Sequence, residues 1–181
     1  MTATLITGAN KGLGFETARR LIAAGHTVYI GSRHAERGRR AAELLGARAV
    51  QLDVTDDASV EAAAKAIEPD GGLDVLINNA GIQEEMGDNG VVAGAADLTA
   101  DVMRKTFETN VFGMVRVTHA FLPLLERSAA PVVVNVSSGL GSLSLLATLP
   151  GDIYPGVAYP ASKARLRFLV RLTMSATENP R

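Results

Sequence analysis

The residues of this sequence best suited to chemistry are a tyrosine and a lysine four positions apart, Tyr159 and Lys163. On a helix, this spacing puts both side chains on one face, one turn apart. A free phenol has a pKa of about 10, and a neighbouring ammonium group lowers that pKa by favouring the phenolate. A phenol tuned in this way suits general acid–base catalysis near neutral pH. Tyr154 is a competing phenol but has Ala158, not a lysine, four positions on, and a surface pair without a role is the alternative for Tyr159 and Lys163.

A second group of residues has the spacing of a phosphate-binding loop. Residues 7–14 read TGANKGLG, between an apolar run and a helical stretch. Glycines let a backbone turn sharply and approach a pyrophosphate, and a helix N-terminus offers free N–H groups and a positive dipole end. A glycine-rich turn that only packs helix against strand is the alternative. We predict a dinucleotide site that includes Gly8, Asn10, Lys11, Gly12, Leu13 and Gly14.

The end of the second apolar run bears on the choice of dinucleotide. An NAD site usually places an acidic residue here, where it bonds the ribose 2′-hydroxyl. Residues 29–33, YIGSR, contain no acid. Arg33 and Lys11 could instead contact a 2′-phosphate, and Ser32 could donate its hydroxyl. Unless both cations are ordinary solvated residues, the site prefers NADP(H) to NAD(H).

Alternating strands and helices must position these residues. Short runs rich in Val, Ile and Leu are typical of strands buried on both faces. They are Ala3–Thr7, Thr27–Ile30, Arg48–Leu52, Leu73–Ile77 and Pro131–Val136. The helical stretches are Gly12–Ala24, Glu36–Leu45, Ala58–Ile67, 101–126 and 157–176. The alternation predicts a three-layer α/β fold of Rossmann type with a doubly wound parallel sheet, in one domain over 1–181.

Further short segments complete a family pattern around these elements. After the glycine loop come Asp53, Asn78-Asn79-Ala80-Gly81, Asn110, Ser138 and the Tyr159–Lys163 segment, each in this order. The order resembles the classical short-chain dehydrogenase/reductase family, carbonyl-reductase-like members included, from residue 3 to about 176. The resemblance implies an oxidoreductase that moves hydride between NADP(H) and a carbonyl or alcohol.

The resemblance also implies the roles of the catalytic residues. Tyr159 would give a proton to the carbonyl oxygen during reduction, and Ser138 would hydrogen-bond that oxygen. Lys163 would lower the pKa of Tyr159 and hold the nicotinamide ribose. Asn110 would position a water in a proton relay that reaches Lys163.

Residues near strand ends would complete the cofactor site. Asp53 would contact the adenine amino group, although it could equally cap the helix that follows. The other implied cofactor contacts are Ser32, Arg33, Val54, Asn79, Ala80, Gly81, Tyr159 and Lys163. The leucines at 143, 145, 146 and 149 lie in a predicted loop, where they either wall a substrate pocket or pack beneath the loop.

The composition of the chain excludes several other classes of protein. The chain has 181 residues, a net charge of −1 and a pI near 6.3, which gives no electrostatic reason to bind nucleic acid or an anionic membrane. Without cysteine there is no disulfide, thiol nucleophile or zinc–thiolate site, and we predict no metal. No apolar run approaches about 18 residues and the N-terminus lacks a leader pattern, so a cytoplasmic protein is expected.

The resemblance stops before the family's last strands and substrate loop, because the sequence ends at Arg181. The substrate therefore stays open, and a truncated, non-catalytic dinucleotide-binding protein is the rival hypothesis. We expect a homodimer or homotetramer through the helices at 101–126 and 157–176. We also expect the 181-residue chain alone to self-associate through its open fifth strand, to hold cofactor loosely and to turn over little substrate.

Overall fold

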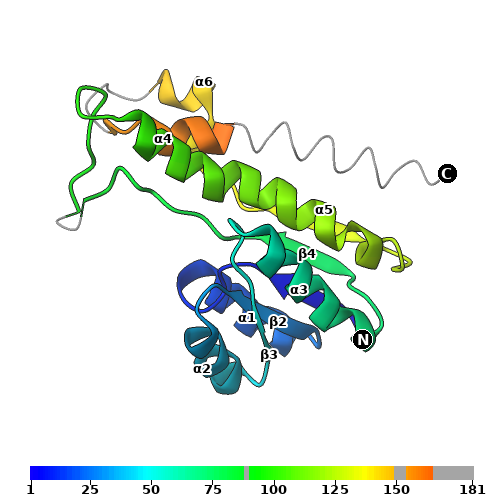
Figure 1. Ribbon diagram of the computed structural model, residues 1–181. Coiled ribbons are helices and arrows are strands. Elements are labelled where there is room, and N and C mark those ends of the chain that lie inside the picture. The colour runs from blue at the N-terminus through cyan, green and yellow to red at the C-terminus, as the bar shows by residue number, and fades with distance from the viewer. Residues whose placement is uncertain (88–89, 149–153, 165–181) are drawn as a thin grey trace.

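Five short strands form one parallel sheet, as the apolar runs predict. The computed structural model describes residues 1–87, 90–148 and 154–164 (Figure 1). The strands are β1 (Ala3–Ile6), β2 (Thr27–Ser32), β3 (Arg48–Gln51), β4 (Val75–Asn78) and β5 (Val132–Asn135). Their order in the sheet is β3-β2-β1-β4-β5, and every neighbouring pair is parallel. The chain therefore reverses direction across the sheet between β1 and β4, where such folds bind ligands.

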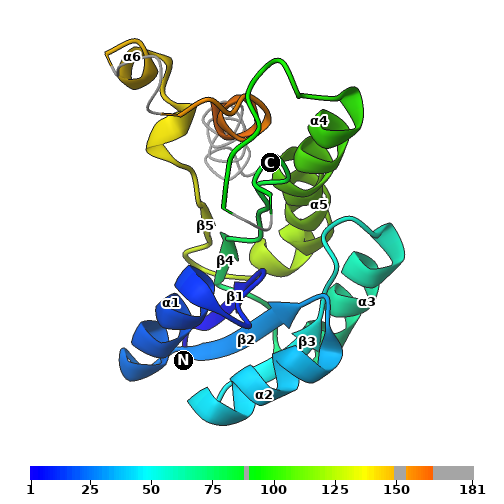
Figure 2. The ribbon, with the colours of Figure 1, turned by 90° about the vertical axis from the view of Figure 1, so that its left-hand side faces the viewer.

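Helices cover both faces of this sheet, which confirms the three-layer prediction. On one side lie α1 (Gly12–Ala23) and α2 (Ala35–Leu45), and on the other α3 (Asp57–Ile67) and α5 (Gly113–Leu125), while α4 (Ala100–Phe107) extends beyond the sheet (Figure 2). Successive residues of β1 point to opposite faces: Leu5 packs with Val60 and Phe121 of α3 and α5, whereas Ile6 packs with Ala18 of α1. This two-sided burial explains why the strand sequences lack polar alternation.

β5 departs from that pattern. Its Val132 and Val134 are 46% and 40% exposed, although the sequence predicts a strand buried on both faces. Among the described residues, β5 pairs with β4 alone and stands at the edge of the sheet. The two valines therefore have no covering layer in this part of the chain.

The long predicted helix at 101–126 is interrupted at its centre. A π-helical segment, Glu108–Phe112, joins α4 to α5 and contains the buried Asn110. Such segments often occur at functional sites because they re-aim one turn of a helix. The remaining short helices are η1 (Glu68–Asp70), η3 (Gly139–Gly141) and α6 (Leu143–Leu146).

The predicted loop at 139–156 thus begins with helical turns. Leu143 and Leu145 are 78% and 45% exposed, so they do not pack beneath the loop. Leu149 lies outside the described residues. The predicted helix at 157–176 is helical over 158–164, and the rest of that prediction also lies outside them.

Candidate active site

The glycine loop lies between β1 and α1 and turns through two left-handed glycines. Gly8 and Gly12 have φ values of 64° and 59°, which disfavour any side chain. Gly14 needs to be glycine for a different reason. A Cβ on Gly14 would lie 2.5 Å from Asn79 Nδ2 and 2.9 Å from Ala9 Cα. The backbone of the loop and the side-chain amide of Asn79 therefore pack too closely at Gly14 to admit a side chain.

Most of the predicted cofactor residues line a single cavity beside this loop. Its volume is about 570 Å³, within the range of small-molecule pockets. The predicted residues in its wall are Gly8, Asn10, Lys11, Gly12, Leu13, Gly14, Arg33, Asp53, Val54, Asn79, Ala80 and Gly81. Ser32, Tyr159 and Lys163 are outside this set.

Ser32 is turned away from the cavity. It is 1% exposed, and its hydroxyl donates to the carbonyl of His34 at 3.0 Å. Arg33 does reach the cavity wall, and its Nε donates to His34 Nε2 at 3.3 Å. His34, to which the sequence assigns no role, therefore contacts the cation expected to bind phosphate.

Asp53 holds a turn and does not cap a helix. Its Oδ1 accepts from the N–H of Thr55 at 3.0 Å and from the Thr55 hydroxyl at 2.7 Å. Burial tends to raise the pKa of Asp53, but these bonds outweigh it and hold the pKa below its usual value. The cap of α3 is Asp56, which accepts from Ala58 N–H at 3.0 Å, so the alternative that Asp53 is the cap is wrong.

The asparagines after β4 join strands and the glycine loop. Asn78 Nδ2 donates to Asn135 Oδ1 of β5 at 2.8 Å. Asn79 Nδ2 donates to the carbonyls of Thr7 and Gly8 at 2.8 and 3.2 Å. Asn79 therefore lines the cavity, and its side-chain amide also holds the glycine loop in place.

Tyr159 and Lys163 lie together, as their spacing predicts. The ammonium of Lys163 is 5.6 Å from the centre of the Tyr159 ring and donates to the carbonyl of Val136 at 2.9 Å. Lys163 is 4% exposed, and this burial lowers its pKa. A Cβ on Gly81, a cavity residue, would lie 3.5 Å from Lys163 Nζ. The pair therefore adjoins the end of the cavity formed by Gly81.

Ser138 lies on a segment packed against the same helical turn. The Ser137 hydroxyl donates to the Lys163 carbonyl at 3.3 Å, and a Cβ on Gly141 would lie 2.8 Å from that carbonyl oxygen. Ser138 Oγ accepts from the N–H of Leu140 at 3.2 Å. A hydroxyl that accepts in this way keeps its own proton for another acceptor.

Asn110 ties the loop after β4 to the Tyr159 helix. Its Oδ1 accepts from Ile82 N–H at 2.8 Å, and its Nδ2 donates to the Ile82 carbonyl at 2.9 Å and to Ser162 Oγ at 3.0 Å. Both amide protons are thereby used inside the protein, so a relay water could contact this side chain only at Oδ1.

Glu85 is a further site residue that the sequence reasoning missed. It is 3% exposed and accepts bonds from Tyr154 Oη and from the N–H groups of Val157, Ala158 and Tyr159. Burial and then this carboxylate raise the pKa of Tyr154, which makes Tyr154 a poorer acid than an ordinary phenol. In the sequence, the only signal at this position is that two glutamates, Glu84 and Glu85, are adjacent.

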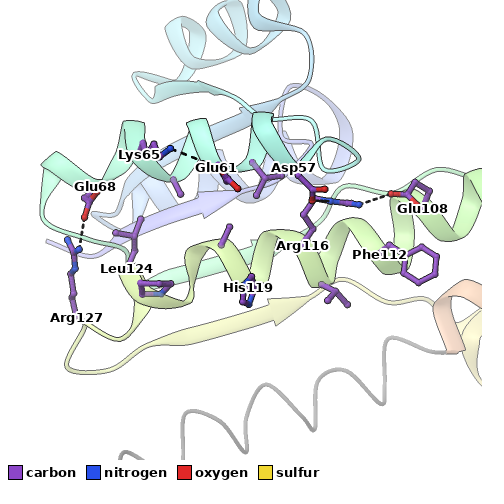
Figure 3. A pocket seen from close by; sticks show the side chains of 15 residues that line it. Asp57, Glu61, Lys65, Glu68, Glu108, Phe112, Arg116, His119, Leu124 and Arg127 are labelled. Atoms are coloured by element: carbon purple, nitrogen blue, oxygen red, sulfur yellow. Dashed lines mark hydrogen bonds and ion pairs between the residues drawn. The ribbon is translucent and has the colours of Figure 1, made fainter.

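A larger cavity lies elsewhere, between α3 and α5 (Figure 3). It has a volume of about 750 Å³ and shares no lining residue with the cavity at the glycine loop. Arg116 crosses it and pairs with Asp57 and Glu108. Its size alone does not make it the site, because the groups suited to chemistry lie around the other cavity.

The described residues contain neither a membrane-spanning helix nor a cluster of metal ligands. No helix in that part of the chain is long and apolar enough to cross a membrane. Nor does it bring together three His, Cys, Asp or Glu side chains that could hold a metal ion.

A parallel sheet with a glycine loop at its reversal point defines a dinucleotide-binding α/β protein. Comparison with known proteins narrows the class, since the model of the short-chain dehydrogenase family matches residues 2–179. The chain belongs to the short-chain dehydrogenase/reductase family, whose members are oxidoreductases that use a nicotinamide cofactor.

Individual relatives agree with this assignment. Short-chain dehydrogenase/reductase 1 of Saponaria officinalis is 39% identical over 170 residues, which cover 82% of this chain and 55% of the relative. (−)-Isopiperitenone reductase of Mentha piperita is 40% identical over 183 residues, with 78% and 58% covered. The crystal structure of a short-chain dehydrogenase from Streptomyces avermitilis is 33% identical with a TM-score of 0.78, and covers 94% of this chain and 58% of that one. The chain thus spans somewhat more than half the length of these relatives.

Proposed function

We propose that this protein is an NADP(H)-dependent reductase or dehydrogenase that interconverts a carbonyl and an alcohol. The observation that carries the proposal is the arrangement at Gly81. This residue lines the glycine-loop cavity, and a Cβ on it would lie within 3.5 Å of the Lys163 ammonium beside Tyr159. A binding cradle and an acid–base pair therefore adjoin each other.

The residues present fit a nicotinamide dinucleotide. The glycine loop and the N-terminus of α1, which line the cavity, would hold the pyrophosphate. Asp53 would accept from the adenine amino group. Arg33 and Lys11, which face the same cavity, would bind a 2′-phosphate, and this is the basis for proposing NADP(H) over NAD(H). When bound, the nicotinamide supplies or accepts the hydride.

The chain's own residues would handle the proton. In reduction, Tyr159 Oη gives its proton to the substrate oxygen while Ser138 donates a hydrogen bond to the same oxygen. The phenolate left on Tyr159 is stabilised by the Lys163 ammonium. Burial makes that ammonium costly, and the bond to the Val136 carbonyl offsets part of the cost.

Self-association is part of the proposal. Phe112 and Val115, on the π segment and α5, are 52% and 44% exposed. We propose that this part of the 101–126 stretch pairs with a second copy, which light scattering on the purified protein would test. A monodisperse monomer would contradict it.

The test of the function is turnover of a carbonyl panel with NADPH, followed by NADPH absorbance. The panel should begin with cyclic terpenoid ketones, because relatives include a (+)-neomenthol dehydrogenase of Capsicum annuum at 34% identity. Reduction of at least one ketone, dependent on Tyr159, is the expected result. NADPH binding without turnover of any carbonyl would support a non-catalytic dinucleotide-binding protein instead.

A further inference from the structure

The helix that carries Tyr159 and Lys163 begins without a local cap. Val157, directly before it, has no side chain that could accept a hydrogen bond, and Gly156 has none at all. Two helices of this chain are capped locally, α3 by Asp56 and α4 by Thr99, whereas α1 and α2 have no side-chain cap. The first N–H groups of a helix need partners, because they have none within the helix.

Glu85 supplies those partners from a distant segment. Its Oε2 accepts from Ala158 N–H at 2.6 Å and from Val157 N–H at 3.3 Å, and its Oε1 accepts from Tyr159 N–H at 3.1 Å. Pro160 has no N–H, and Ala161 N–H already donates to the Val157 carbonyl. A single carboxylate therefore satisfies the whole free N-terminus of this helix.

The surroundings are built for a charged group at this point. Glu85 is 3% exposed, and burying a carboxylate is costly unless it is paired or hydrogen-bonded. The positive end of the helix dipole and several N–H donors meet that requirement. Gly156 leaves the necessary room, since a Cβ there would lie 2.3 Å from Glu85 Oε1. A side chain at 156 would displace the carboxylate.

We propose that Glu85 is a positioning residue for Tyr159. It fixes the first turn of the catalytic helix against the loop after β4, at the residue whose phenol moves the proton. Asn110 secures the same helix one turn later through Ser162. The inference rests on the proposed function, and it predicts a defect in the chemical step because small displacements of a reacting group cost large factors in rate.

The adjacent glutamate offers a matched control. Glu84 carries the same side chain but pairs with Lys105 at the surface, at 3.2 Å. Glu85→Gln and Glu84→Gln therefore make the same chemical change at neighbouring positions, one buried at the helix and one exposed. Glu85→Asp keeps the charge on a shorter side chain, and Gly156→Ala crowds the unaltered carboxylate together with Tyr154 and Val92.

The experiment measures kcat and KM for a reduced ketone, the Kd for NADPH, and amide hydrogen exchange, all in the natural full-length protein. For Glu85→Gln we expect kcat to fall at least about tenfold, because misplacement by about 1 Å costs up to about 10²-fold. The Kd for NADPH should change less than about threefold, because none of the residues bonded to Glu85 lines the glycine-loop cavity. Exchange should accelerate at 157–159. Glu84→Gln should match the wild type, and Glu85→Asp should recover part of kcat.

Two results would overturn the inference. One is wild-type kcat in Glu85→Gln. The other is a loss of kcat accompanied by equally weakened NADPH binding and faster exchange throughout the chain, which is general destabilisation. If Glu85→Gln does not fold, Glu85→Asp and Gly156→Ala must show the selective loss of kcat. Absence of turnover in a wild type that binds NADPH would contradict the proposed function instead, and exchange at 157–159 would still show whether Glu85 caps the helix.

Discussion

The cofactor cradle and the proton-transfer site differ in how their residues come together. The cradle is centred on one contiguous turn, residues 7–14, whose path depends on backbone conformation at Gly8 and Gly12, and segments after β2, β3 and β4 complete its wall. The proton-transfer site joins the end of β5, the π segment and the helix at 158–164. Its parts are held by side-chain bonds between residues 26 to 74 positions apart, such as Ser137 to Lys163 and Glu85 to Tyr159.

This difference has consequences for how each region fails. A cradle made from backbone depends on a few positions that must be glycine, and a change there disturbs binding. A site made from distant side chains depends on bonds whose loss disturbs geometry while leaving the cradle intact. The two regions should therefore be separable by mutation.

The largest expected effect comes from Tyr159→Phe, which should separate the proton-transfer site from the cofactor cradle. Tyr159→Phe should lower kcat by about 10²- to 10⁴-fold, because a positioned proton donor contributes that much, while the Kd for NADPH stays near its wild-type value. Steady-state turnover and a fluorescence titration check both. A Tyr159→Phe protein that reduces ketones normally, beside a Tyr154→Phe protein that does not, would assign the proton to the other phenol.

Arg33→Ala acts on the cradle alone. It should weaken NADPH by about 1.5–3 kcal/mol, the range for a hydrogen bond to a charged group, and leave NADH binding unchanged. The physical reason is that only NADPH carries the 2′-phosphate that Arg33 would meet. Titration of both cofactors into wild type and variant is the measurement. Equal affinity of the wild type for the two cofactors would refute the proposed preference.

Gly14→Ala tests where the cradle meets the loop after β4. The added Cβ would lie 2.5 Å from Asn79 Nδ2, so we expect a loss of about 1–3 kcal/mol in stability, typical of overpacking, together with weaker cofactor binding. Gly12→Ala is the control, since its Cβ would meet nothing within 4 Å and only its φ of 59° is unfavourable. The measurement is the free energy of unfolding of both variants in urea. An equal loss of stability in the two variants would show that crowding at Gly14 has no effect of its own.

The smallest effect concerns a carboxylate outside both regions, Asp74. It accepts from Ser128 Oγ at 2.5 Å and from Ala3 N–H at 2.7 Å, and these bonds hold its pKa below the usual 3.8. A depressed folded-state pKa stabilises the protein above the unfolded-state pKa, and that contribution disappears as pH falls through the folded-state value. Asp74→Asn should cost about 1 kcal/mol at neutral pH and less below about pH 4, measured by urea unfolding at each pH. A loss independent of pH would contradict this account.

Local patterns predicted much of the fold and of the cradle. The strands follow from two-sided burial, as at Leu5 and Ile6, and every strand was predicted to within two residues at each end. The glycine spacing placed the cradle because the conformation at Gly8 and Gly12 belongs to those residues themselves. Ser32 stays a predicted cofactor contact, but its hydroxyl donates to the carbonyl of His34, a bond that the sequence did not indicate.

The sequence by itself determined the order of elements, the glycine loop and the spacing that puts Tyr159 beside Lys163, because each depends on residues close together in the chain. Only the tertiary structure decided which distant groups hold that pair in place. The π segment at Asn110 and the cap from Glu85 rest on bonds across the fold. Such bonds have no local periodicity, so a glutamate that caps a helix from another element cannot be distinguished in the sequence from its exposed neighbour Glu84.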